Sequence, residues 1–145
     1  MEKEPDITTF RADRPGVRKV LGDLEAEIME FIWSHPSQEG VTVRDVFEVL
    51  YERRHLAYTT IMNTMTRLAK KRLLRIEKRD QAYVYFPTYT RDAFISCFVG
   101  RFLDDLLVNF SGAALQHLQS LRDAEGIARL QQLMQEVERR KEEER

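Results

Sequence analysis

Apolar positions recur along the first half of the chain with the spacing of amphipathic helices. Three stretches follow the 3.6-residue repeat, and each places its apolar residues on one side. His35-Pro36 closes the first stretch, because proline disfavours helical geometry in the residue before it. Thr42 and Asp45 have the spacing of a capping box at the start of the second. The pattern therefore predicts three helices, over about residues 23–33, 43–52 and 58–71.

The period then changes from 3.6 to two. Apolar and polar residues alternate over 74–79 and again over 82–87, with Asp80-Gln81 between the two runs. This predicts a two-stranded hairpin, although its turn lacks the glycine that such turns favour. Three helices followed by a hairpin form a winged helix, which is a variant of the helix-turn-helix.

Beyond residue 89 the pattern is helical again. We expect helices over about 92–109, 113–121 and 126–141, with Ser111-Gly112 breaking the first from the second. The first of them carries nearly two apolar stripes where a single-domain core needs only one. We therefore predict that it forms a homodimer interface of the large apolar kind found in obligate dimers. The residues expected in that interface are Phe94, Phe98, Phe102, Leu106 and Phe110.

These elements predict a fold that is mainly α-helical with a small β-hairpin wing. The first twenty residues show no periodicity and contain Pro5, Pro15 and Gly16, which indicates a flexible arm. The expected division is an arm over 1–20, a winged-helix DNA-binding domain over 21–89, a helical dimerisation domain over 90–141 and a charged tail over 142–145.

The charge is unevenly distributed, although the formal net charge is only −1. Between Arg53 and Arg79 nine basic side chains stand against one acid, Glu77. Positive charge focused in one supersecondary segment favours a polyanionic partner. The alternative is a basic face that is merely solvated.

The third helix is the one that a helix-turn-helix places in the major groove. Its outward face has the chemistry for reading bases, since threonines can touch thymine methyl groups, asparagine can pair with adenine and arginine with guanine. The residues expected to read bases are Thr59, Thr60, Asn63, Thr66 and Arg67. Those expected to contact phosphates are Arg53, Arg54, Tyr58, Lys70, Lys71, Lys78 and Arg79.

Other classes of protein find little support. The chain has no glycine-rich phosphate loop, no HExxH and no GxSxG motif, and its three histidines are scattered, so we expect no enzyme, cofactor or small-molecule substrate. The lone Cys97 lies among phenylalanines, which favours a small buried hydrophobe over a redox switch, and no metal site is expected. The charged first twenty residues and the absence of a long apolar run predict a cytoplasmic protein.

Several stretches resemble the penicillinase and methicillin-resistance repressors, the BlaI/MecI/CopY group. Residues 24–33, LEAEIMEFIW, look like the opening helix of that family. Residues 42–46, TVRDV, resemble its second helix, and LAYTTIM (56–62) with RLAKK (67–71) its recognition helix. AYVYFP (82–87) resembles its wing. The resemblance runs from about residue 21 to 121.

The resemblance implies a homodimeric, sequence-specific repressor of transcription in bacteria. Its partner would be a double-stranded palindromic operator with TACA/TGTA-like half-sites. It also implies inactivation by proteolysis, triggered by a membrane-bound sensor metalloprotease that responds to a β-lactam, copper or another signal. The family's cleaved bond is matched here by Asn109–Phe110.

Two departures from the family pattern matter. Arg72 stands where the family has a glycine in left-handed conformation, so strain is expected at that corner. The chain also lacks the cysteine-rich metal hook of the copper-sensing branch. The alternative to a repressor is a winged helix that docks an acidic protein without reading DNA.

Overall fold

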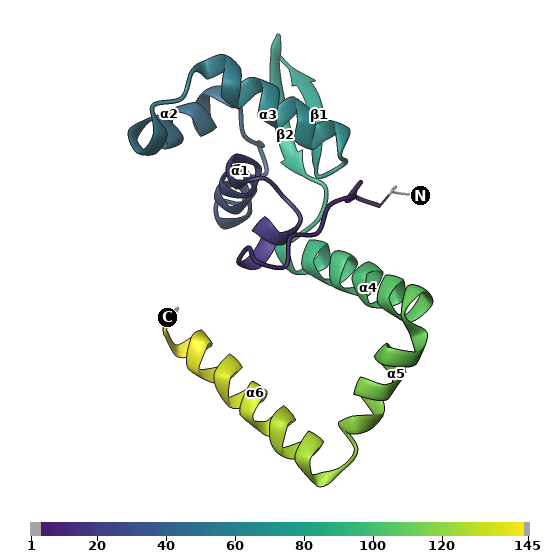
Figure 1. Ribbon diagram of the computed structural model, residues 1–145. Helices are drawn as coiled ribbons and strands as arrows, with labels where there is room; N and C mark the ends of the chain where they lie inside the picture. Colours follow the sequence, from purple (N-terminus) through teal and green to yellow (C-terminus); the bar gives the residue numbers. More distant parts are fainter. Residues whose placement is uncertain (1–3, 144–145) are drawn as a thin grey trace. The chain divides into compact units, whose positions relative to one another are not determined.

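The computed structural model describes residues 4–143 and divides the chain into two compact units, Met1–Val99 and Gly100–Arg145. The first unit is the predicted winged helix (Figure 1). Its elements are the 3₁₀-helix η1 (Gly16–Lys19), the helices α1 (Asp23–Ser34), α2 (Val43–Arg54) and α3 (Tyr58–Lys70), and the strands β1 (Leu74–Arg79) and β2 (Ala82–Pro87).

Helix α2 begins where the capping box was predicted. The backbone N–H of Asp45 donates to the Thr42 hydroxyl at 3.1 Å, and the N–H of Thr42 donates to the Asp45 carboxylate at 2.9 Å. Each bond satisfies a donor that the first helical turn would otherwise leave unpaired. The cap fixes the start of the helix that precedes the candidate recognition helix.

The core of the first unit is formed where the apolar stripes of the three helices meet. Fully buried side chains include Ile28 and Met29 of α1, Leu50 of α2, and Met65 and Leu68 of α3. Burial of a side chain of this size stabilises the fold by about 1.5–3 kcal/mol. The core therefore holds α3 with one face inward and one face toward solvent.

The beginning of α4 (Arg91–Asn109) belongs to this core and not to a separate domain. Phe94 is completely buried, its ring 5.5 Å from that of Trp33, and Phe98 is 9% exposed. The Trp33 indole N–H donates to the carbonyl of Tyr89 at 2.9 Å, which ties α1 to the segment before α4. Our assignment of Phe94 and Phe98 to a dimer interface was wrong, because periodicity shows an apolar face and not what covers it.

The hairpin has the predicted two-residue turn. Arg79 pairs with Ala82, and both Asp80 and Gln81 have positive φ, 48° and 70°. Positive φ at both central residues is the geometry of a type I′ turn, which suits the twist of the strands but favours glycine or asparagine. Val41 adds an isolated bridge to Tyr85 at the base of the hairpin.

Parts of the predicted arm, residues 1–20, pack against the first unit within the described residues. Pro5 and Val17 are buried, and Val20 is 8% exposed. The N–H of Asp6 donates to the carbonyl of Lys71 at 2.8 Å. Proline and glycine here shape a segment that packs without forming a long helix.

The second unit contains the end of α4 with α5 (Ser111–Ser120) and α6 (Ala124–Glu143). The break after α4 falls at Phe110, one residue before the predicted Ser111-Gly112. Gly126 is required by the close turn into α6, since a Cβ there would lie 1.9 Å from the carbonyl oxygen of Ser120. Among the residues described in this unit, only Gly126 is classed as buried.

Candidate nucleic-acid interface

Helix α3 presents two chemically distinct faces. Ile61, Met65 and Leu68 are buried in the core, and Thr64 is buried with its hydroxyl donating to the carbonyl of Thr60 at 2.8 Å. All of the predicted base-reading side chains are exposed on the other side. They are Thr59, Thr60, Asn63, Thr66 and Arg67.

Two of these exposed side chains have partners within the helix. The Arg67 guanidinium donates to the Thr64 hydroxyl at 3.3 Å, and the Thr66 hydroxyl donates to the carbonyl of Met62 at 2.9 Å. The bond at 3.3 Å is long, so a base or phosphate can compete for Arg67. The bonded Thr66 hydroxyl leaves its methyl group as the contact suited to an apolar base edge.

The corner before α3 combines aromatic and basic side chains. The rings of Phe47 and Tyr58 lie 5.5 Å apart, edge to face, and Tyr58 is 43% exposed. Together with Arg44 and Glu48, these two rings line a shallow hollow of about 270 Å³. Tyr58 thus lies at the first turn of α3 with its ring partly exposed, and its contact with a phosphate stays a prediction.

Two predicted phosphate contacts are held in ion pairs with α1. Arg54 lies 2.5 Å from the Glu27 carboxylate, and the Lys71 ammonium lies 2.8 Å from that of Glu25. The Glu25 side chain is 9% exposed, and its carboxylate also accepts the N–H of Gly22 at 3.0 Å. Moving Lys71 to DNA would leave a nearly buried carboxylate without its cation, so the structure favours a structural role for Lys71.

Two basic side chains on one face of β1 flank an acidic one. The Glu77 carboxylate accepts hydrogen bonds from Arg75 and Arg79, and both guanidinium groups lie over the Phe86 ring, 4.6 and 5.0 Å from its centroid. Desolvation raises the pKa of Glu77, but these hydrogen bonds and the two positive charges together lower the pKa by more than desolvation raises it. The net shift is therefore downward. Lys78 is exposed on the opposite side of the strand.

Sequence reasoning missed the partners of these basic residues. Arg75 was left out of the predicted phosphate contacts, although it alternates with Arg79 on one face of β1 and its position in the strand would have grouped the two. The pairing of Lys71 with Glu25 joins residues far apart in the sequence, and no local pattern signals it.

Basic residues predicted to contact DNA lie in three places around α3. Arg53 is exposed at the end of α2, Lys70 at the end of α3, and Lys78 and Arg79 near the tip of the wing. Figure 1 shows α3 and the hairpin next to each other in the first unit. Cations on both sides of a polar helix face suit a duplex, whose phosphates flank the base edges.

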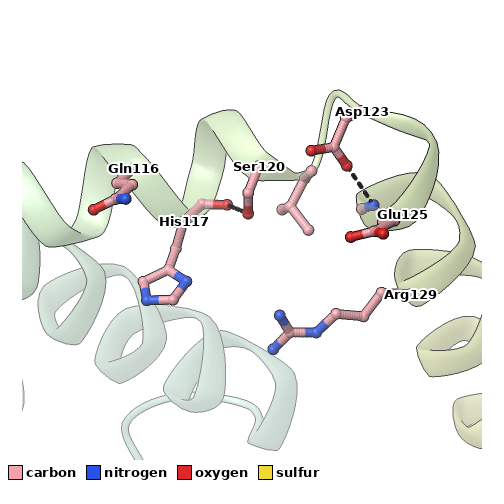
Figure 2. Close-up of a pocket in the computed structure, with 8 residues that line it drawn as sticks. Gln116, His117, Ser120, Asp123, Glu125 and Arg129 are labelled. Carbon is pink, nitrogen blue, oxygen red and sulfur yellow. Dashed lines mark hydrogen bonds between the residues drawn. The ribbon is translucent and has the colours of Figure 1, made fainter.

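The second unit has a hollow of a different character, of about 400 Å³, at the α5–α6 corner. Figure 2 shows His117 and Arg129 on facing sides of it, with Asp123 and Glu125 at the start of α6. The Asp123 carboxylate accepts the N–H of Gly126 at 2.7 Å and so caps α6. Acidic and basic groups are mixed here, unlike the basic surface around α3.

The predicted cleavage site lies where α4 ends. The Asn109 amide donates to the carbonyl of Asp105 at 3.0 Å and to its carboxylate at 2.8 Å. Phe110 leaves the helical conformation and is 62% exposed. The Asn109–Phe110 bond therefore lies at the break between α4 and α5.

The model of the penicillinase repressor family matches residues 21–136. The chain belongs to this family. The match includes the whole winged helix and most of the second unit, and it begins after the N-terminal arm.

Individual relatives agree with this assignment. A transcriptional regulator BlaI of Mycobacterium tuberculosis is 46% identical over 76 residues, 52% of this chain and 54% of the relative, so the match spans about half of that protein. The penicillinase repressor of Bacillus licheniformis is 29% identical over 131 residues, 85% of this chain and 95% of that protein.

Among solved structures, the DNA-binding domain of the repressor BlaI is similar to this chain, with 30% identity and a TM-score of 0.42. The match covers 48% of this chain and 80% of that domain. MepR from S. aureus, solved in complex with DNA, is also similar, with 16% identity and a TM-score of 0.44. The match covers 81% of this chain and 77% of the MepR chain.

No helix among residues 4–143 is long and apolar enough to cross a membrane.

Proposed function

We propose that this protein is a homodimeric transcriptional repressor that binds a palindromic operator. The observation that carries the proposal is the division of α3 into a buried apolar face and an exposed face of threonine, asparagine and arginine. Threonine and asparagine lower the helix propensity of an exposed face, and this one gains no packing in return. Reading base edges accounts for their presence.

Each part of the surface has a distinct role in this proposal. The outer face of α3 enters the major groove, with Asn63 and Arg67 supplying the most discriminating contacts. Arg53, Lys70 and the basic tip of the wing contact phosphates and set orientation. Membership in the penicillinase repressor family and the similarity to a transcriptional regulator BlaI and a penicillinase repressor support this assignment.

Dimerisation is proposed through the second unit. Its three helices expose large apolar side chains that the unit itself does not cover, among them Leu103, Leu107, Phe110, Leu118 and Leu133. Water-exposed apolar surface of this extent indicates an interaction site. A second copy of the chain is the proposed occupant, because a two-fold dimer places two α3 helices on the two halves of a palindrome.

Release from DNA is proposed to follow cleavage of Asn109–Phe110 by a membrane-bound sensor metalloprotease. The exposed, non-helical Phe110 supports access to the bond. Cleavage would separate α5 and α6 from the DNA-binding unit and with them much of the proposed interface. The repressor would act in the cytoplasm, and the nature of the inducing signal is set by the sensor.

The experiment that tests the proposal is selection of operators by footprinting of genomic DNA with the purified protein. We expect protected sites with two-fold symmetry and TACA/TGTA-like half-sites. On such a site, Asn63→Ala or Arg67→Ala should cost about 1–3 kcal/mol of binding free energy, while non-specific binding falls less. Wild-type affinity in both variants would show that α3 does not read the bases.

A further inference from the structure

The N-terminal arm contacts the corner between α3 and β1, where two candidate DNA-binding elements join. Arg72, in this corner, donates from its Nε to the carbonyl of Glu4 at 2.6 Å. One residue away, the carbonyl of Lys71 accepts the N–H of Asp6 at 2.8 Å. Pro5, between these two bonds, is fully buried. In Figure 1 the described start of the chain runs past this corner.

Arg72 adopts a conformation that favours glycine. Its φ is 65°, in the left-handed region, where a residue with a Cβ is strained relative to glycine. Nothing in the helix end itself requires an arginine. The strain is offset by the bond to Glu4, which a glycine would not make.

The arm precedes residues 21–136, the part of the chain that the family model matches. Two further bonds at this corner lie within the winged helix. The Lys71 ammonium is paired with the Glu25 carboxylate, and the N–H of Leu73 donates to the carbonyl of Leu68 at 3.0 Å. The arm therefore adds its contacts to a corner that also has bonds of its own.

We propose that residues 4–6 and Arg72 form a clip that sets the angle between the recognition helix and the wing. Arg72 is a positioning residue in this account and does not contact DNA. The inference rests on the proposed DNA-binding function, because the clip acts on how α3 and the wing engage one duplex together. A duplex read by both elements requires a defined angle between them.

The test compares full-length variants by operator affinity, non-specific affinity and hydrogen exchange. Arg72→Gly removes the clip and relieves the backbone strain, so we expect an unchanged or higher melting temperature. Exchange protection of the Asp6 amide should be lost. Operator affinity should fall about three- to tenfold, the usual size of coupling between contacting groups, with non-specific affinity nearly unchanged. Gln81→Gly relieves the same kind of strain at φ 70° without touching the arm, so it is the matched control for the melting temperature and for Asp6 protection; because Gln81 lies at the wing tip, it is not a control for operator affinity.

A second variant separates positioning from charge. Pro5→Gly loosens the arm and leaves Arg72 in place, so it should lower operator affinity by a similar factor. The double variant should bind no more weakly than either single one. Additive losses would indicate that Arg72 contacts DNA directly. Wild-type operator affinity in Arg72→Gly would indicate that the arm does not affect DNA binding. Either result overturns the proposal. Loss of Asp6 protection is measured without DNA, so it tests the clip even if the proposed operator binding fails.

Discussion

The two units of this chain differ in how they cover their apolar side chains. In the first unit the stripes of α1, α2 and α3 meet, and α4 adds Phe94 to a core that is complete within one protomer. In the second unit Phe110, Leu118 and Leu133 are each more than half exposed. The first unit covers its apolar side chains by itself, whereas the second exposes the apolar surface that we propose a second copy of the chain covers.

The largest expected effect concerns the complete core. Phe94→Ala would leave a cavity beside Trp33 and Phe98 and should lower the free energy of unfolding by about 3–5 kcal/mol. Leu133→Ala in α6 should change the unfolding of the first unit by less than about 0.5 kcal/mol. Chemical denaturation followed by Trp33 fluorescence measures both. Equal losses would mean that the two units share one core.

The second prediction concerns the exposed surface. Phe110→Asp places a charge in the proposed interface and should give a monomer in sedimentation velocity. Operator affinity should fall roughly a hundredfold, since the two half-sites would no longer be bound by one linked molecule. Gln131→Asp, which adds the same charge at an exposed polar position of α6, should remain dimeric. A tight dimer in Phe110→Asp would remove this region from the interface.

The third prediction separates two neighbouring lysines. Lys71→Ala should destabilise the first unit by about 1–2 kcal/mol, because Glu25 would keep its buried carboxylate without a cation and Lys71 is itself partly exposed. Lys70→Ala should leave stability unchanged and lower the salt dependence of DNA binding by about one unit. Thermal unfolding and binding at several salt concentrations measure the two effects. The reverse pattern would restore Lys71 as a phosphate contact.

The smallest expected effect is a pH dependence confined to α6. Hydrogen bonds from Arg139 and Arg140 hold the pKa of Glu136 down at about 2, against an ordinary value of 4.5. A carboxyl with a lowered folded-state pKa contributes stability that is fully present above 4.5 and is lost as the pH falls toward 2. Circular dichroism should show less acid loss of helix in Glu136→Gln than in Glu142→Gln. Identical acid profiles would mean that these exposed ion pairs add nothing.

The sequence predicted the elements of the first unit well, because local signals specify them. The capping box at Thr42 and the change of period near residue 74 place α2 and the hairpin correctly. Long-range contacts were not predictable in this way. Neither the pairing of Lys71 with Glu25 nor the burial of Phe94 against Trp33 follows from spacing along the chain.

The candidate surface was predicted in part. Exposure of Asn63 and Arg67 followed from the helical period once α3 was placed, and the structure confirms that exposure. The interactions that fix their surroundings did not follow. The arm was predicted to be flexible from its lack of periodicity, yet Pro5 is buried and the N–H of Asp6 bonds to the end of α3.

We propose that one protein dimer reads a two-fold symmetric duplex with two α3 helices. Fluorescence anisotropy tests this proposal with three duplexes. They are a selected operator, the same operator with one half-site scrambled, and a fully scrambled duplex. We expect the intact operator to bind one dimer and the half-scrambled duplex at least about tenfold more weakly, with every affinity falling as salt rises. Equal affinity for all three duplexes at every salt concentration would contradict the claim.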